Sequence, residues 1–534
     1  MKATDVLVQC LENEGVEYVF GIPGTEILDL VHSLSKSNIQ FILVRHEQGA
    51  AFMADLYGRL SKKPGVCLAT LGPGATNLLT GISSAQLDHS PVIALVGQVS
   101  SEKQHPESHQ YLNLTEIYEP ATKWSTQIKS AQMIPVTIRK AFRTAMMEKP
   151  GAVLLALPEN LATEMIAGQP LALSQIPPSL PVQKAIQTAH SIIQDYMKPF
   201  ILIGNGVIRE NAMEELRIFI DALQSPVAHS FMAKGILPKN HPSNYFTFGF
   251  SENDKVLAGI AEADLLIVIG FDFVEQLPQK WNGGKTPVIH IDTLPAEINE
   301  YYPAEIELTG NIKQILHALN QLKMPPKSWV PQGNLKEKIK TSYQIRDHQG
   351  ESNRLPLTTE NILLMIEELV PDQSIIISDV GAHKLSIART YQPKQPDKLI
   401  ISNGLASMGI ALPGAIGAKL ACPEDPVICI TGDGGALMNF AEIETAKRLG
   451  VSFIMIVLND SVLKLEEMKM EKMFESSEGV SFQNPDFTQL AEGYGIKCGR
   501  AHNLRQFEEH LREALLVQSQ GEIMLIDVLL PSSP

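Results

Sequence analysis

Two short stretches, Thr431-Gly432-Asp433-Gly434-Gly435 and Leu458-Asn459-Asp460-Ser461, decide the fold of this chain. Each follows an apolar run, Val427–Ile430 or Phe453–Leu458, with the length and composition of a buried parallel strand. Open α/β sheets bind their ligands at the carboxyl ends of such strands. Two aspartates there, beside glycines whose amides can approach an anion, suit Mg²⁺ holding a diphosphate. Two ordinary strand-to-turn junctions are the simpler alternative, and the paired spacing argues against it.

The composition is that of an ordinary soluble globular protein, with 44% hydrophobic and 19% charged residues. The formal net charge of −15 argues against nucleic acid or an anionic membrane as the main partner. No apolar run approaches the length of about 20 residues that spans a bilayer. The N-terminus has an amphipathic pattern rather than that of a signal peptide, so we expect a cytoplasmic protein. The five scattered cysteines predict reduced thiols, without a disulfide framework or a zinc site.

At 534 residues, the chain is too long for one hydrophobic core. Short apolar runs alternate with helical patterns throughout, which predicts α/β domains with parallel sheets. Proline-rich sequence at 175–181 and around 325–331 predicts two linkers. We therefore expect three doubly wound domains: an N-terminal one over 1–170, a central one over 185–330 and a C-terminal one over 355–534.

The central segment contains Ile203-Gly204-Asn205-Gly206, which has the first two glycines of a dinucleotide-binding motif and lacks the third. A structural turn is the favoured interpretation. A nucleotide-binding sensor built on this segment is the weaker alternative.

Further motifs lie along the whole chain: Phe20–Gly24, Arg45–Ala51, Pro64–Val66, Leu71–Asn77 and Asp379–His383. Together with the two opening stretches they resemble the thiamine-diphosphate enzymes of the acetolactate synthase family. The resemblance implies a pyrimidine-binding first domain, a diphosphate-binding third domain and a related middle domain that holds FAD in some members. It also implies that each active site combines two subunits, and therefore a homodimer or homotetramer.

The resemblance assigns individual roles. Glu47 matches the acid that activates the coenzyme through its pyrimidine ring, although such a residue taken alone is usually a helix cap or surface group. The apolar residues after it should help Glu47 keep or share a proton. Asp433 and Asp460 match side-chain ligands of Mg²⁺, and Val462 matches a main-chain carbonyl ligand. The other coenzyme-binding candidates are Pro23, Gly24, Gly72, Asn77, Gly381, Ala382, His383, Ala406, Met408, Gly432, Gly434, Gly435 and Leu463.

Two of the candidates have a structural alternative. Met408 matches the bulky residue that bends the coenzyme into its reactive shape, and would otherwise be a core methionine. Gln110 matches a catalytic polar residue near the substrate, and a loop glutamine is an equally good interpretation.

The resemblance implies decarboxylation of pyruvate or another 2-oxo acid, and the fate of the remaining carbons defines the enzyme. Joining them to a second 2-oxo acid gives acetolactate. Asn459–Ser461 and Gly270–Glu275 resemble the catabolic, FAD-independent synthases. Gly249–Asp254 stands where FAD-binding members have a glycine-rich turn, so we expect no flavin.

Three residues favour other reactions. Glu26 stands where catabolic synthases carry a lysine, which would weaken attraction for an anionic acceptor. Glu466 matches the position of a catalytic glutamate in simple 2-oxo acid decarboxylases, and Lys469 could meet a substrate carboxylate; a solvated helix face explains both equally well. Carboligation is the leading hypothesis and a non-ligating decarboxylase the first alternative. A catalytically silent, cofactor-binding scaffold is a further one, against which Glu47 argues.

Overall fold

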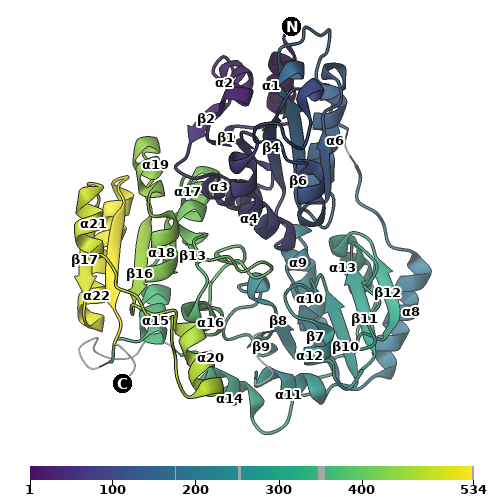
Figure 1. Cartoon of the computed structure of the whole chain (residues 1–534). Coiled ribbons are helices and arrows are strands. Elements are labelled where there is room, and N and C mark those ends of the chain that lie inside the picture. Colours follow the sequence, from purple (N-terminus) through teal and green to yellow (C-terminus); the bar gives the residue numbers. More distant parts are fainter. Residues whose placement is uncertain (175, 250–253, 347–354, 532–534) are drawn as a thin grey trace. The chain divides into compact units, whose positions relative to one another are not determined.

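The computed structural model describes residues 1–174, 176–249, 254–346 and 355–531. It contains three parallel six-stranded sheets, which follow one another along the chain with helices between their strands (Figure 1). This confirms the α/β class with doubly wound sheets. None of the helices in the described ranges has the length and apolarity that a membrane crossing requires.

The first sheet is formed by residues 18–158. Its strands are β1 (Tyr18–Gly21), β2 (Gln40–Leu43), β3 (Gly65–Ala69), β4 (Val92–Gln98), β5 (Trp124–Gln127) and β6 (Ala152–Pro158), in the spatial order β2-β1-β3-β4-β6-β5. The helices are α1 (Ala3–Asn13), α2 (Leu28–Leu34), α3 (Glu47–Ser61), α4 (Pro73–Leu87), α5 (Leu114–Tyr118), α6 (Ile134–Met146) and α7 (Glu159–Ala162). β3, β4 and β6 are buried along their whole length, as expected for central strands covered on both faces.

The second sheet has the same construction. Its strands are β7 (Pro199–Ile203), β8 (Val227–His229), β9 (Asn244–Thr247), β10 (Leu265–Ile269), β11 (Val288–Asp292) and β12 (Ala304–Thr309), in the order β12-β11-β10-β7-β8-β9. The helices are α8 (Gln183–Asp195), α9 (Gly206–Arg209), α10 (Met213–Leu223), α11 (Val256–Ala261), α12 (Pro278–Trp281), α13 (Ile312–Asn320) and α14 (Leu335–Ser342).

The two glycines of the GxG turn in the second sheet face a neighbouring loop. A Cβ on Gly204 would lie 2.3 Å from the carbonyl oxygen of Gly270, and one on Gly206 would lie 2.7 Å from the Cα of Gly270. No side chain fits at that separation, so the close approach of two backbones explains both glycines. This favours the structural-turn interpretation. Of the segment that bears on the flavin prediction, residues 250–253 lie outside the described ranges.

The third sheet carries the two opening stretches. Its strands are β13 (Ile375–Ser378), β14 (Leu399–Ile401), β15 (Val427–Gly432), β16 (Ile454–Asn459), β17 (Lys497–Ala501) and β18 (Met524–Leu529), in the order β14-β13-β15-β16-β18-β17. The helices are α15 (Thr359–Leu369), α16 (Ala382–Thr390), α17 (Ala411–Ala421), α18 (Asp433–Asn439), α19 (Glu442–Leu449), α20 (Lys464–Phe474), α21 (Phe487–Gly493) and α22 (Leu504–Ser519). The strands predicted from Val427–Ile430 and Phe453–Leu458 are neighbours, as expected.

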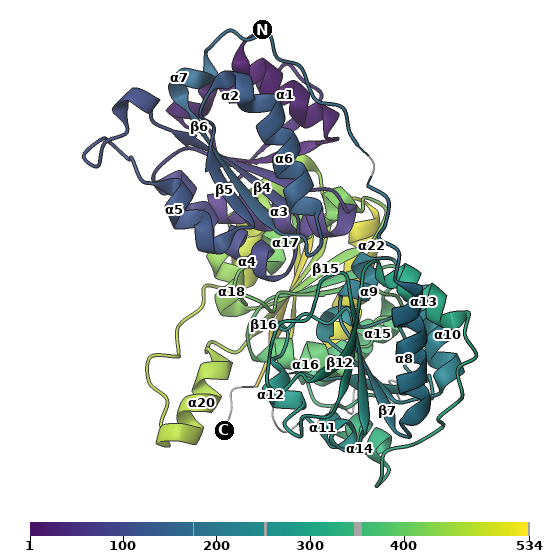
Figure 2. The ribbon, with the colours of Figure 1, turned by 90° about the vertical axis from the view of Figure 1, so that its right-hand side faces the viewer.

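Contacts divide the chain into two compact units. The first combines Met1–Gln175, Ile376–Gly381 and Ser402–Pro534, and the second combines Ile176–Ile375 and Ala382–Ile401. Within the first unit α3 packs along α17 (Figure 1, Figure 2). A Cβ on Gly417 would lie 2.2 Å from the carbonyl oxygen of Met53, so a glycine is needed where the two helices meet.

A buried charge cluster lies on α3 two turns after Glu47. Asp55 is fully buried, and one of its carboxylate oxygens lies 3.7 Å from Nη2 of Arg59, which also lies 3.5 Å from Asp88. Burial raises the pKa of Asp55 to about 6; Arg59 opposes this rise and the charge of Asp88 adds to it. The Oδ1 of Asp88 accepts hydrogen bonds from the backbone N–H groups of Asn403 and Gly404. The cluster therefore connects α3 to the segment that leads to Met408.

We expect Asp55→Asn to stabilise the protein at pH 7.5. The folded state binds a proton at Asp55 more tightly than the unfolded chain, in which the pKa is near 3.8, so the contribution of this group to stability falls as pH rises from about 4 to about 6. Asparagine resembles the protonated acid and avoids a cost of about 1 to 3 kcal/mol. Urea unfolding at pH 7.5 and 4.5 checks this, with the larger gain expected at pH 7.5. Destabilisation at pH 7.5 would contradict it.

Candidate functional site

Glu47 begins α3 and is separated from the first-sheet strand β2 by the short turn Val44–His46. The residue before it, His46, is extended at φ −150°, and its ring Nδ1 accepts a hydrogen bond from the backbone N–H of Gln48, which caps the helix. The Glu47 side chain is buried, with 9% of the residue exposed, and its Oε2 accepts a hydrogen bond from Nδ2 of Asn77 at 2.9 Å. Two of the predicted residues, from α3 and α4, are thus brought together, and the second carboxylate oxygen remains available to exchange a proton.

The junction that carries Glu47 is fixed by Glu442, a residue that sequence reasoning missed. Oε1 of Glu442 accepts hydrogen bonds from the backbone N–H groups of Arg45 at 3.0 Å and His46 at 3.1 Å. Its Oε2 accepts one from Oγ1 of Thr445 at 2.6 Å. Burial raises the pKa of Glu442, and these hydrogen bonds oppose the rise. Glu442, a carboxylate on α19 in the segment of the third sheet, therefore positions Glu47 in the segment of the first sheet.

Gly72 and Gln110 are also neighbours. Gly72 precedes α4 with φ +55°, and a Cβ on it would lie 2.8 Å from the Cβ of Gln110. Gln110 is exposed, in a left-handed conformation with φ +57°. This places it beside the start of the helix that carries Asn77.

The turn that carries Pro23 and Gly24 contacts Thr70 at the end of β3. A Cβ on Gly24 would lie 2.4 Å from the Cβ of Thr70, and Pro23 is exposed. The hydroxyl of Thr70 donates to Oε2 of Glu26 at 2.7 Å. An open cavity of about 400 Å³ adjoins this turn, and its polar lining comes from Glu26, Lys103, His105, Ser108, His109 and Glu159.

Asp433 ties together the ends of the two strands that carry the opening stretches. It is 2% exposed. Its Oδ2 accepts hydrogen bonds from the backbone N–H groups of Asp460 at 3.2 Å and Ser461 at 2.6 Å, and from Nδ2 of Asn484 at 2.7 Å. Its Oδ1 accepts one, from the backbone N–H of Gly434 at 2.7 Å. With Oδ2 occupied by three donors, Oδ1 is the oxygen left for a cation.

Asp460 brings a second carboxylate to the same place. Burial raises its pKa to about 6, and the negative charge of Asp433 contributes to the rise. The carbonyl of Val462 accepts from the backbone N–H of Lys464 at 2.9 Å and keeps a second lone pair. Two carboxylates and a carbonyl form the hard oxygen set that Mg²⁺ prefers, with waters or ligand oxygens completing its shell. In the described part of the chain no group of three or more His, Cys, Asp and Glu side chains forms a metal cluster, so a site here needs such added oxygens.

An apolar patch adjoins the carboxylates. A Cβ on Gly434 would lie 3.4 Å from Cε of Met408, 3.5 Å from Cδ2 of Leu463 and 3.5 Å from Cζ of Phe482. Met408 and Leu463 are therefore brought together beside the glycine turn, while Phe482 is a neighbour that the sequence did not suggest. A side chain on Gly434 would fill this hollow. The glycine therefore leaves space beside the carboxylates for a bulky ligand.

Asp379 holds the segment that carries Met408. It is 1% exposed, and its carboxylate accepts hydrogen bonds from the backbone N–H groups of Gly409 at 2.8 Å and Ala411 at 3.3 Å and from Oγ1 of Thr431 at 3.1 Å. Burial raises the pKa of Asp379, and these hydrogen bonds oppose the rise. A Cβ on Gly435 would lie 3.1 Å from the same carboxylate. The Asp379 carboxylate therefore contacts both the segment that carries Met408 and the glycine turn at Gly435.

The remaining candidates differ in their placement. Gly432 ends β15, and Ala406 lies in the Met408 segment with φ +56°. Gly381 ends a stretch of the first compact unit, whereas Ala382 and His383 begin α16, which belongs to the second.

Glu466 and Lys469 pair with each other on α20. The Nζ of Lys469 lies 3.2 Å from Oε1 of Glu466, and both side chains are more than half exposed. No residue of α20 is buried. These observations favour the solvated-face interpretation of the charged helix.

Comparisons with known proteins cover the whole chain. Three family models match: the N-terminal TPP binding domain of thiamine pyrophosphate enzymes over residues 1–117, their central domain over 186–319 and their C-terminal TPP binding domain over 379–528. Acetolactate synthase of Bacillus subtilis (strain 168) is 32% identical, over 99% of this chain and 93% of the relative. A probable acetolactate synthase large subunit of Methanocaldococcus jannaschii is 33% identical, over 99% and 92%. The large subunit of acetolactate synthase isozyme 2 of Escherichia coli (strain K12) is 31% identical, over 93% and 90%.

Proposed function

The chain belongs to the thiamine-diphosphate enzymes of the acetolactate synthase family, and we propose on that basis that it decarboxylates pyruvate and joins the remaining two carbons to a second 2-oxo acid, giving acetolactate. The observation that carries the proposal is the convergence of Asp433 and Asp460 at the ends of β15 and β16. Two neighbouring carboxylates, of which Asp433 is buried and Asp460 is half-buried, repel each other unless a cation compensates their charge. The coenzyme's diphosphate is the partner that such a cation would hold.

The residues divide into two groups by task. Asp433, Asp460 and the carbonyl of Val462 would hold Mg²⁺, and Met408 and Leu463 would support the apolar face of the coenzyme. Thiamine diphosphate, when bound, supplies the carbon nucleophile and the electron sink for loss of carbon dioxide. Glu47 would hold the proton exchanged with the coenzyme's pyrimidine ring: Asn77 fixes Oε2, which leaves Oε1 for the exchange.

Gln110 beside Gly72 would contact the substrate. The cavity that includes Glu26 is the place where an acceptor would approach.

We extend the proposal to the assembly, the domains and the other cofactor. The Glu47 group and the Asp433 group belong to one compact unit, and we propose that a homodimer or homotetramer completes each site with a second copy. The domain boundaries proposed are 1–170, 185–330 and 355–534, in a cytoplasmic enzyme of the catabolic type. We propose that FAD is not required, because Gly249–Asp254 stands where FAD-binding members have a glycine-rich turn.

One incubation tests the reaction. The protein is mixed with pyruvate, Mg²⁺ and thiamine diphosphate, with and without FAD, while carbon dioxide is measured and the carbon product is identified by mass. We expect acetolactate at equal rates in both mixtures. Acetaldehyde without acetolactate would show that the protein is a simple decarboxylase that uses Glu466 and not a carboligase. Coenzyme binding without pyruvate consumption would indicate a catalytically silent scaffold.

A further inference from the structure

The segment after α20 returns the chain to the metal-site loop. The backbone N–H of Leu463 donates to the carbonyl of Val480 at 2.8 Å, and that of Phe482 donates to the carbonyl of Ser461 at 3.1 Å. Val462 and Ser481 form an antiparallel bridge between these two bonds. The exposed helix α20, which stands clear of the third sheet in Figure 2, is therefore joined to the site at both ends by paired backbone.

Asn484 lies three residues after Ser481 and faces three acceptors. Its Nδ2 lies 2.7 Å from Oδ2 of Asp433, 2.9 Å from Oδ1 of Asn459 and 3.2 Å from Oγ of Ser461. The amide group has only two protons, so the acceptors compete for them. The opposite amide orientation would direct Oδ1 at the oxygens of Asp433 and Asn459, so the surroundings require the donor to point this way. The amide thus connects the end of β15 to the end of β16.

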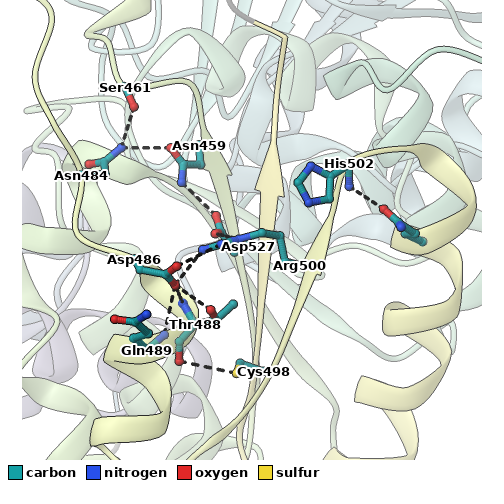
Figure 3. A network of polar contacts seen from close by, with 11 residues as sticks. Asn459, Ser461, Asn484, Asp486, Thr488, Gln489, Cys498, Arg500, His502 and Asp527 are labelled. Carbon is teal, nitrogen blue, oxygen red and sulfur yellow. Dashed lines mark hydrogen bonds and ion pairs between the residues drawn. The ribbon is translucent and has the colours of Figure 1, made fainter.

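A chain of polar contacts supports this amide from the sheet (Figure 3). Nδ2 of Asn459 donates to Oδ1 of Asp527 at 3.0 Å, and Asp527 is fully buried in β18. Nε of Arg500 donates to the other oxygen of Asp527 at 2.8 Å. The same guanidinium donates to Asp486 at 2.7 and 3.0 Å. Three neighbouring strands therefore contribute to one network that ends at Asp433.

The backbone next to Asn484 is fixed as well. Asp486 caps α21 by accepting hydrogen bonds from the backbone N–H groups of Thr488 at 2.9 Å and Gln489 at 3.1 Å. The hydrogen bonds from Arg500 lower the pKa of Asp486 well below its ordinary value, so this carboxylate is ionised throughout the pH range of use. With the bridge at Ser481 on one side and the capped helix on the other, Asn484 has little freedom to move.

We propose that Asn484 is a positioning residue of the metal site, which orients the Asp433 carboxylate for the cation. Its donation, with the two backbone donors, occupies Oδ2 and turns Oδ1 toward the place where Asp460 brings its own carboxylate. Without it Oδ2 of Asp433 keeps two of its three donors, and the Asn459–Ser461 loop loses its link to residue 484. The inference rests on the proposed function and adds a residue to it. Partners of metal ligands typically contribute 10- to 100-fold to metal affinity.

The test compares Asn484→Leu, which keeps the branched shape and removes the donor, with the parent chain and with Gln483→Ala as a control at the exposed neighbouring position. Thiamine diphosphate is titrated calorimetrically at a series of Mg²⁺ concentrations, and thermal unfolding is followed without ligands. We expect the Mg²⁺ concentration needed for half-maximal coenzyme binding to rise roughly 10- to 100-fold in Asn484→Leu. We expect no change in Gln483→Ala.

The possible outcomes separate the inference from the proposed function. If the parent chain binds no coenzyme at any Mg²⁺ concentration, the proposed function fails. If the parent binds and Asn484→Leu has the same Mg²⁺ requirement, the inference alone is wrong, and a lower melting temperature with unchanged binding would assign Asn484 a purely structural role. Asn484→Ser, whose hydroxyl is too short to reach Asp433, replaces the leucine variant if that variant does not fold, and the same rise is expected of it.

Discussion

The Glu47→Gln protein is expected to consume pyruvate roughly 100- to 10,000-fold more slowly than the parent, the range typical of losing a positioned acid or base. Glutamine has the shape of glutamate, and its Oε1 can still accept the hydrogen bond from Asn77. It cannot exchange a proton with the coenzyme's pyrimidine ring. Coenzyme affinity should therefore remain within a few-fold of that of the parent.

The measurement pairs pyruvate consumption at saturating coenzyme with calorimetric coenzyme binding. Gln48→Ala is the matched control, because it alters the next side chain on α3 and leaves the backbone N–H that caps the helix. A Glu47→Gln protein that binds the coenzyme and turns over pyruvate at the parent rate would remove Glu47 from the mechanism.

Asp433→Ala should weaken Mg²⁺-dependent coenzyme binding by more than about 100-fold, because even residues that only orient metal ligands contribute 10- to 100-fold. The substitution removes a ligand oxygen and also the acceptor of four hydrogen bonds, which come from Gly434, Asp460, Ser461 and Asn484. The loop that carries Asp460 then loses its anchor to β15. The loss of the ligand oxygen and the loss of these hydrogen bonds both weaken coenzyme binding.

Thermal unfolding provides a readout that does not depend on turnover. A ligand at 100 times its dissociation constant stabilises a protein by about 2.7 kcal/mol, so Mg²⁺ with coenzyme should raise the melting temperature of the parent and not that of Asp433→Ala. Glu424→Ala, an exposed carboxylate in the same segment, should behave as the parent. An Asp433→Ala protein that gains the parent's stabilisation would show that the coenzyme is anchored elsewhere.

The sequence was sufficient to predict the α/β class and the neighbouring strands β15 and β16, because fully buried parallel strands are apolar along their whole length. Two edge strands, β5 and β12, gave no such signal. β5 is only partly buried and β12 is mostly exposed or half-buried, so neither has a continuous apolar run.

The site was predictable where its chemistry is local and not where it depends on distant residues. Asp433 and Asp460 follow strands, and their position at one sheet edge could be inferred. Glu442 meets Arg45 and His46 across about 400 positions, and no periodicity encodes such a contact. A glutamate in the otherwise apolar stretch Phe440–Ile443 is the one available signal, since a buried charge needs a partner. Asn484 gave no signal at all, because its role depends on the return of the chain after α20.

The packing of α3 against α17 has a consequence for biosynthesis. Twelve of the 15 residues of α3 are buried, as are eight of the 11 of α17. A ribosome makes α3 first and must translate more than half of the chain before α17 emerges to cover it. The nascent N-terminal region therefore exposes the apolar face of α3 that packs on α17, for tens of seconds at ordinary elongation rates. Chaperones commonly act in this period. Expressed as a separate fragment, that region would keep the surface permanently and would be expected to aggregate.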